Sequence, residues 1–240
     1  MGFSLKATGV RGILLDIEGT TTPVQFVYDT LFPYVRQQLD RFLETHAHED
    51  KILEIVRALK LERDDDVRAN LSPPDWQDPP LAYIRWLMDQ DRKSTALKVL
   101  QGIIWFDGYQ AGHLHGVVFP DVPPALERWR RAGIDVRIFS SGSELAQRLL
   151  FGSMKDGDLT RLLNGYFDTT IGPKGEASSY SEIAKAFHLP CAQILFISDV
   201  TRELDAAHTA GMHTLLCTRP GNHPQVIHGH TPISTFDQIR

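Results

Sequence analysis

Residues 13–22 read Ile-Leu-Leu-Asp-Ile-Glu-Gly-Thr-Thr-Thr, and this stretch decides the fold. Its apolar run predicts a buried strand, and Gly19 predicts a sharp turn directly after it. Asp16 and Glu18 therefore stand at the carboxyl end of a buried strand, where charge is costly unless something compensates for it. Oxygen ligands of this kind suit Mg²⁺. An aspartate held there can also attack phosphorus and form an aspartyl-phosphate.

The spacing of the two acids carries a second prediction. Residues i and i+2 of a strand point to the same side, so Asp16 and Glu18 can face one site unless the chain turns between them. One acid would then act as a nucleophile and the other as a proton donor and acceptor. On this motif alone, two solvated acids at a strand end remain the alternative, since exposed acids are common.

Composition limits the class of protein. The chain has 240 residues, 42% hydrophobic and 23% charged, which fits a globular protein of one large domain or one domain with an insertion. Its net charge of −5 disfavours broad nucleic-acid binding. Cys191 and Cys217 are too few for a disulfide framework and lack zinc-site spacing. Without a membrane-length apolar stretch or a signal peptide, we expect a cytoplasmic protein that binds no membrane.

The periodicity of apolar residues changes along the chain. From residue 26 to about residue 100 it is mostly helical, whereas after Pro120 short strands alternate with helices. Such alternation predicts a parallel sheet with helical crossovers. We therefore expect a Rossmann-like core of residues 1–23 and 117–240, interrupted by a helical cap of residues 24–116. The later strands are expected at residues 135–139, 167–171, 194–197 and 213–217, and the later helices at 125–132, 143–150, 179–187 and 203–210.

Polar residues follow three of these later strands. Ser140 and Ser141 precede a helix and could present backbone N–H groups to an anion, although an ordinary helix cap is equally consistent with them. Lys174 lies in a turn and could pin a phosphate, although most loop lysines are solvated. Asp199 ends an apolar strand as Asp16 does, and could be a further ligand of the cation. Glu203, four residues later, could simply support a helix dipole.

The order acid, hydroxyl, lysine, acid at successive strand ends resembles the haloacid-dehalogenase-like phosphatases. Within that superfamily the chain is similar to the enolase-phosphatases of methionine salvage. That resemblance rests on five strings: Asp-Ile-Glu-Gly-Thr-Thr-Thr-Pro from Asp16, Ser-Ser-Gly-Ser from Ser140 with residues 147–152, Ser-Asp-Val-Thr-Arg-Glu-Leu from Ser198, Leu-Gln-Gly from Leu100 with Trp105, and Thr-Arg-Pro-Gly-Asn from Thr218. The first motif departs from the superfamily pattern, since Glu18 stands where a second Asp is usual.

The resemblance implies an activity and a cofactor. Such enzymes convert a methylthio-substituted diketopentyl 1-phosphate to an enediol phosphate and then to an acireductone, using one Mg²⁺ in a chain that acts alone. Asp16 and Asp199 would hold the ion, with Glu18 beside them through its backbone carbonyl. Ser140, Ser141 and Lys174 would bind the substrate phosphate. The catalytic residues would be Asp16, Glu18 and Lys174.

Two further groups have open assignments. The aromatic residues Trp105, Phe106 and Tyr109 could line an apolar pocket for the methylthio group, although core packing of the cap is the commoner role. The histidine sets His113/His115 and His223/His228/His230 lack convincing metal-site spacing, so hydrated surface histidines are expected.

Three alternatives compete with this interpretation. A phosphatase for another small phosphate monoester would share the fold, and cap residues would separate the two. A metal-free dehalogenase also uses an aspartate nucleophile, but Glu18 and Asp199 would burden a site without a cation. A catalytically silent binder of phosphorylated ligands would need no complete set of polar groups, yet the expected groups are present.

Overall fold

The computed structural model describes residues 2–225 and 229–240. The chain divides into two compact units, which we call the core unit, residues 1–27 and 115–240, and the helical unit, residues 28–114. The change from one unit to the other falls within a short π-helix, η1 (Val27–Leu31).

A six-stranded sheet of parallel strands forms the centre of the core unit, in the order β3-β2-β1-β4-β5-β6. The strands are β1 (Gly12–Leu15), β2 (Asp135–Phe139), β3 (Gly165–Phe167), β4 (Ile194–Ser198), β5 (His213–Cys217) and β6 (Thr231–Ile233). Because β1 pairs with both β2 and β4, the segments that follow these three strands emerge at the same edge of the sheet. The predicted parallel α/β architecture is confirmed.

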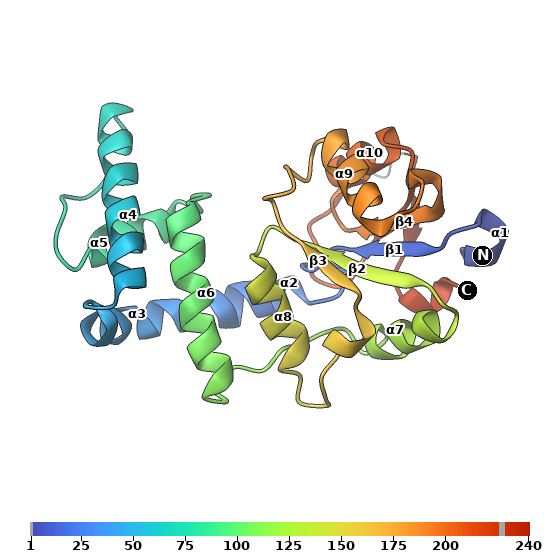
Figure 1. Cartoon of the computed structure of the whole chain (residues 1–240), viewed down its shortest axis with the longest axis horizontal. Coiled ribbons are helices and arrows are strands. Elements are labelled where there is room, and N and C mark those ends of the chain that lie inside the picture. Colours follow the sequence, from blue (N-terminus) through green and yellow to red (C-terminus); the bar gives the residue numbers. More distant parts are fainter. Residues whose placement is uncertain (1, 226–228) are drawn as a thin grey trace. The chain divides into compact units, whose positions relative to one another are not determined.

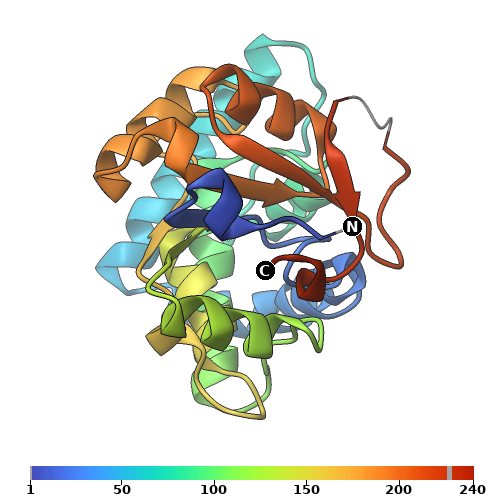
Figure 2. The same cartoon turned by 90° about the vertical axis from the view of Figure 1, so that its right-hand side faces the viewer.

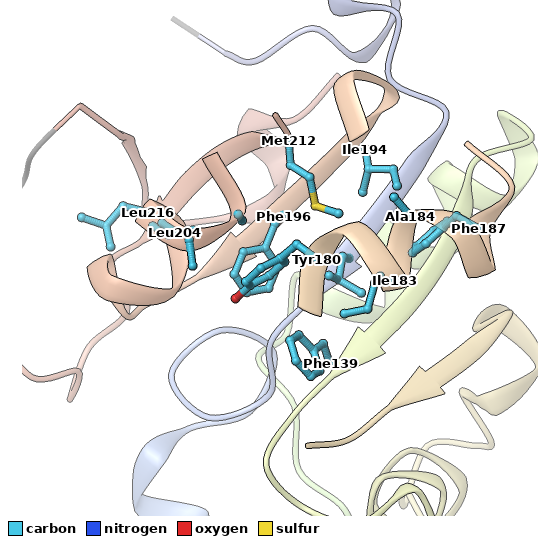
Figure 3. Packing of buried hydrophobic residues seen from close by; sticks show 13 residues of the cluster. Phe139, Tyr180, Ile183, Ala184, Phe187, Ile194, Phe196, Leu204, Met212 and Leu216 are labelled. Atoms are coloured by element: carbon cyan, nitrogen blue, oxygen red, sulfur yellow. The ribbon is translucent and has the colours of Figure 1, made fainter. Parts of the chain in front are cut away.

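Helices cover both faces of this sheet, with α9 and α10 on one side and α7 on the other (Figure 1). The core-unit helices are α1 (Leu5–Thr8), α2 (Val24–Phe26), α7 (Val122–Arg131), α8 (Glu144–Gly152), η2 (Thr160–Leu162), α9 (Ala177–Phe187), η3 (Cys191–Gln193), α10 (Thr201–Thr209) and η4 (Phe236–Gln238). Under α9 and α10, the ring of Tyr180 packs against Phe139 of β2 and Phe196 of β4 at centroid distances of 5.7 and 5.1 Å (Figure 3). This packing fixes strands whose ends carry the polar residues.

The strand expected at residues 167–171 lies earlier in the chain, so that prediction was wrong in position. The strand β3 ends at Phe167 because the next residue starts a turn. The Asp168 carboxylate accepts hydrogen bonds from the Thr170 backbone N–H at 2.8 Å and from its hydroxyl at 2.6 Å. A side chain that satisfies the backbone in this way competes with strand pairing.

The helical unit has a hydrophobic core of its own. Its helices are α3 (Phe32–His46), α4 (Asp50–Arg68), α5 (Leu81–Asp89) and α6 (Thr95–Gln110). Their buried residues recur at three and four positions, as the sequence predicts, and include Leu39, Leu59, Ile84 and Leu100. In the part of the chain that the structure describes, no helix is both long enough and apolar enough to cross a membrane.

The two ends of the chain lie together in the core unit (Figure 2). The Phe3 backbone N–H donates to Gln238, and the Arg240 N–H donates to Phe3, both at 2.8 Å. The strand β6 adds to the sheet beside β5 and brings His230 with it. His230 is buried, with ring nitrogens 2.8 Å from the Thr214 hydroxyl and 3.0 Å from an Asp205 carboxylate oxygen. The prediction of a hydrated surface histidine is therefore wrong for this residue.

Three other histidines of the two sets have the exposure that was expected. His113, His115 and His223 are exposed. His228 lies outside the described residues.

Candidate active site

The buried carboxylate of Asp16 lies just beyond the carboxyl end of β1. Its Oδ1 accepts hydrogen bonds from the Lys174 ammonium at 2.6 Å and from the Ile17 backbone N–H at 2.8 Å. Its Oδ2 accepts one from the Ser198 hydroxyl, at the end of β4, at 3.0 Å. Three donors from three segments hold one carboxylate in place, as a nucleophile that must attack in line requires.

Lys174 joins this carboxylate to a second one. Its ammonium lies 2.7 Å from Oε2 of Glu203, in the first turn of α10, and its backbone carbonyl accepts a hydrogen bond from Tyr180 at 2.8 Å. Burial alone lowers the pKa of Lys174, but the Asp16 and Glu203 carboxylates outweigh burial and raise it. The lysine is therefore a fixed positive charge.

Ser198 shows that these carboxyl groups compete for donors. Its hydroxyl lies 3.0 Å from Asp16 and 3.1 Å from Glu203, and its oxygen accepts the Val200 backbone N–H. One hydroxyl carries one hydrogen, so it can donate to only one of the two carboxylates at a time. Burial, and then the Asp16 charge, raise the pKa of Glu203 to about 7.

Asp199 packs directly against the turn that follows the first motif. Gly19 has a φ of +71°, and a Cβ there would lie only 2.3 Å from Oδ2 of Asp199. A glycine is therefore required at this position, both for its backbone conformation and for the close approach of the carboxylate. Burial, and then the Asp16 charge, raise the pKa of Asp199 to about 7.

Glu18 faces the end of the neighbouring strand β2. The Ser140 hydroxyl lies 3.5 Å from Oε2 of Glu18 and also accepts the Gly142 backbone N–H at 3.3 Å. Burial, and then the Asp16 charge, raise the pKa of Glu18, while Lys174 opposes the shift. A carboxyl group with a raised pKa keeps its proton to a higher pH than an ordinary carboxyl group does, which favours the proton-donor role of a general acid.

The loop after β2 contains a helix cap and one exposed serine. Ser143 caps α8 through a hydrogen bond from the Ala146 N–H at 3.3 Å, and Ser141 is exposed at the loop surface. Asp168 accepts the Glu144 N–H at 3.3 Å, which ties this loop to the end of β3.

The balance of charge in this cluster is uneven. Lys174 is the cation that lowers the pKa of Glu18, Asp199 and Glu203, whereas the charge of Asp16 raises all three.

Within the described ranges, no three carboxylate, imidazole or thiolate side chains are grouped to hold a metal ion by themselves. A cavity of about 450 Å³ adjoins the cluster and is lined by residues that include Asp199, Cys217 and Asn222. The chemistry of the donors, all oxygen and more acidic than basic, fits a hard divalent cation.

The comparisons with known proteins agree with this geometry. Residues 10–211 match the model of the haloacid dehalogenase-like hydrolases. The enolase-phosphatase E1 of Synechococcus elongatus is 49% identical over 96% of this chain and 98% of its own length, and that of Pseudomonas aeruginosa is 46% identical over 96% and 98%. The chain belongs to the enolase-phosphatases of the haloacid dehalogenase-like hydrolases.

Solved structures show that the fold is shared. The UTR4 protein of Saccharomyces cerevisiae matches with a TM-score of 0.78 at 33% identity, covering 95% of this chain and 99% of its own. CbbY of Rhodobacter sphaeroides, in complex with phosphate, matches with a TM-score of 0.61 at 13% identity over 95% of both chains, which shows a shared fold. As a member of this family, the chain is an enzyme, a phosphatase.

The segments that follow β1, β2, β3 and β4 carry the predicted site residues Asp16, Glu18, Ser140, Lys174 and Asp199. Two further residues make contacts there that the sequence did not predict. Glu203 was expected at most to support the dipole of α10, and it accepts Lys174 instead. Ser198 was given no role, although a hydroxyl on the last residue of a buried strand, directly before Asp199, was a usable signal.

The three aromatic residues on α6 of the helical unit have different environments. Tyr109 is buried, and its hydroxyl has no hydrogen-bond partner in the described chain. Trp105 is half-buried, packs against Phe32, and donates its indole N–H to the Leu31 carbonyl at 2.9 Å. Phe106 is 39% exposed. Trp105 and Phe106 therefore keep surface that a ligand could contact, whereas Tyr109 belongs to the core of its unit.

Proposed function

We propose that the enzyme converts 2,3-diketo-5-methylthiopentyl 1-phosphate, through an enediol phosphate, to acireductone and inorganic phosphate, in methionine salvage. The curated relatives named enolase-phosphatase, similar over nearly the whole chain, support this reaction. The observation that carries it is the Asp16 carboxylate at the carboxyl end of β1, held 2.6 Å from the ammonium of Lys174. This arrangement supplies a nucleophile and a charge that stabilises phosphate oxygens.

Asp16 attacks the phosphorus atom and takes the phosphoryl group, and water then releases phosphate from it. Lys174 reduces the repulsion between this carboxylate and the anionic phosphate. Ser140 and Ser141 donate to the phosphate oxygens from the loop before α8. The positions of these residues around the strand ends support these roles.

Glu18 handles the protons. It donates one to the leaving oxygen of the substrate and then takes one from the attacking water. Its raised pKa supports the first of these roles, because the protonated form is the donor. The same carboxyl group would move protons during enolisation, and the extra methylene of Glu relative to Asp extends its reach.

One Mg²⁺ per chain fits the oxygen-rich cluster. Asp16 and Asp199 would hold the ion with the backbone carbonyl of Glu18. The Gly19 N–H donates to the Thr22 carbonyl at 2.8 Å, and a trans peptide directs the Glu18 carbonyl the opposite way. When bound, Mg²⁺ stabilises negative charge on phosphate oxygens as a Lewis acid.

The helical unit, residues 28–114, is proposed as the cap that the sequence predicts at residues 24–116. We expect Trp105 and Phe106 to contact the methylthio end of the substrate. The enzyme is expected to act as a cytoplasmic monomer, without a nucleic-acid or membrane partner.

The test follows two signals at once. Wild-type enzyme with Mg²⁺ and the diketo phosphate should give the ultraviolet absorbance of the enediol together with released phosphate. Phosphate release from generic monoesters, with no reaction of the diketo compound, would contradict the proposed substrate and favour a phosphatase of another small monoester on the same fold.

A further inference from the structure

Two side-chain amides in the core unit, those of Gln147 and Asn222, make the same kind of contact: each donates to two backbone carbonyls. The Nε2 of Gln147, on α8, donates to the carbonyl oxygens of Gly142 and Phe167, both at 2.8 Å. The Nδ2 of Asn222 donates to the carbonyl oxygens of Gly19 at 2.9 Å and Cys217 at 3.1 Å. Each amide thus joins a loop of the candidate site to the last residue of a strand, the edge strand β3 for Gln147 and the inner strand β5 for Asn222.

The other half of each amide is left without a partner. Oε1 of Gln147 and Oδ1 of Asn222 are buried and accept no hydrogen bond from any residue that the structure describes. A buried acceptor without a donor costs free energy. The hydrogen bonds that the N–H groups donate must therefore offset this cost, which an apolar side chain of similar size would not carry.

Gln147 acts on the loop of Ser140 and Ser141. The Phe167 carbonyl that it contacts also accepts the Ser140 backbone N–H at 3.2 Å, so the start of the loop and the Gln147 amide share one acceptor oxygen. The Gly142 carbonyl is held toward Gln147. Because a trans peptide is planar, the Ser143 N–H is directed the other way. A loose loop could instead turn the Gly142 carbonyl oxygen toward a bound phosphate and repel it.

Asn222 acts on the turn that follows Asp16 and Glu18. A Cβ on Gly19 would lie 2.3 Å from Oδ2 of Asp199 and 2.8 Å from Oδ1 of Asn222, so both side chains approach the same side of this turn. By fixing the Gly19 carbonyl, Asn222 fixes the neighbouring peptide that carries the Glu18 carbonyl. The unpartnered Oδ1 also lies on the side of Asp199, where it can accept a hydrogen bond from a cation-bound water.

We propose that Gln147 and Asn222 are positioning residues for separate halves of the site. Gln147 positions the loop that binds the phosphate, and Asn222 positions the turn that binds the cation. The division rests on the proposed function, because that function assigns phosphate to one loop and Mg²⁺ to the other.

The experiment uses near-isosteric variants that remove the donors, Gln147→Met and Asn222→Leu, in the full chain. The matched control is Gln193→Met, since Gln193 also has a buried, unpartnered Oε1 but lies in η3, before β4 and at the opposite end of the strands. Calorimetry measures the affinity of each protein for Mg²⁺ alone, and for inorganic phosphate at saturating Mg²⁺. Circular dichroism compares their folds.

The expected result is a reciprocal pattern. Asn222→Leu weakens Mg²⁺ binding by about tenfold or more, the range typical of residues that support metal ligands, and leaves phosphate affinity at saturating Mg²⁺ unchanged. Gln147→Met weakens phosphate binding by about tenfold and leaves Mg²⁺ affinity unchanged. Gln193→Met changes neither.

Two results would overturn the inference. Equal affinities in all three variants, with wild type binding both probes, would show that the amides position nothing and would leave the proposed reaction intact. Parallel loss of both affinities in each folded variant would show a general structural role. If Asn222→Leu does not fold, Asn222→Ala, which removes the donors and adds neither bulk nor charge, must give the same selective loss of Mg²⁺ affinity.

Discussion

Each of the two units buries an aspartate, but the surroundings of the two carboxylates differ. In the helical unit, Asp66 accepts the Tyr83 hydroxyl at 2.8 Å and pairs with Arg92 at 2.7 Å. Its negative charge has a cation of its own. In the core unit, Asp16 shares Lys174 with Glu203.

The pKa shifts reflect this difference. The pKa of Tyr83 is raised, first by burial and then by its hydrogen bond to Asp66, so the tyrosine stays a neutral donor and the network is complete in itself. In the core unit, burial and the Asp16 charge raise the pKa of both Asp199 and Glu203 to about 7. Removing one partner from a complete buried network destabilises a fold, whereas a cluster short of positive charge favours binding of a cation.

The largest expected effect separates the two aspartates by what they do. Asp16→Asn removes the nucleophile while keeping the shape, and should reduce phosphate release by about 10,000-fold or more. Asp66→Asn is the matched control in the helical unit. It should lower the free energy of unfolding by about 1–3 kcal/mol, because it weakens a buried pair, and leave the rate of phosphate release near that of wild type. Steady-state kinetics and urea denaturation measure the two quantities.

A second prediction concerns the shortage of positive charge in the core unit. Mg²⁺ at about 100 times its dissociation constant should stabilise the fold by about 2.7 kcal/mol, since only the folded chain presents the site. Thermal unfolding with and without the ion measures this change. Asp199→Asn should remove most of it, whereas Asp66→Asn should keep it.

The same measurement has a predicted pH dependence. A carboxyl group whose pKa is raised on folding holds its proton more tightly in the folded chain. Without Mg²⁺, the stability that Asp199 contributes should therefore fall as the pH rises from about 4 to about 7, between its ordinary pKa and its raised pKa. With Mg²⁺ the trend from the ion is opposite, because protons compete for the carboxylate at low pH. A gain from Mg²⁺ that is equal at pH 6 and pH 8 would contradict a role for Asp199 as ligand.

The smallest expected effect tests the helical unit as a binding surface. Phe106→Ala should raise the KM for the diketo phosphate by about tenfold, which corresponds to loss of an apolar contact of modest area, and leave kcat nearly unchanged. Leu61→Ala is a suitable control, because Leu61 is an exposed apolar residue on α4 of the same unit. An unchanged KM in Phe106→Ala would remove this residue from the substrate contact.

The sequence predicted the parts of the molecule that depend on local pattern. The run before Asp16 and the helical periodicity between residues 26 and 100 each carry their own signal, so β1 and the helical unit were expected. Long-range pairing was harder to predict. His230 is buried because β6 pairs with β5, and Glu203 meets Lys174 because the segments after β3 and β4 converge. Neither contact has a counterpart in the local sequence.

The amide contacts illustrate the same limit. Gln147 and Asn222 belong to strings that resemble the family, yet their partners are backbone carbonyls, which no residue pattern specifies. The proposed role of these two residues therefore depends on where the folded chain places the loops and the strand ends.

In the proposed reaction Asp16 takes the phosphoryl group while Glu18 moves protons in both steps. Single-turnover kinetics of Glu18→Asp, with enediol absorbance and a phosphate sensor recorded together, tests it most directly. We predict that the rate constant for enediol formation falls about tenfold more than that for phosphate release, because the shorter acid loses reach to the carbon proton. Equal slowing of the two steps would contradict a separate role for Glu18 in enolisation.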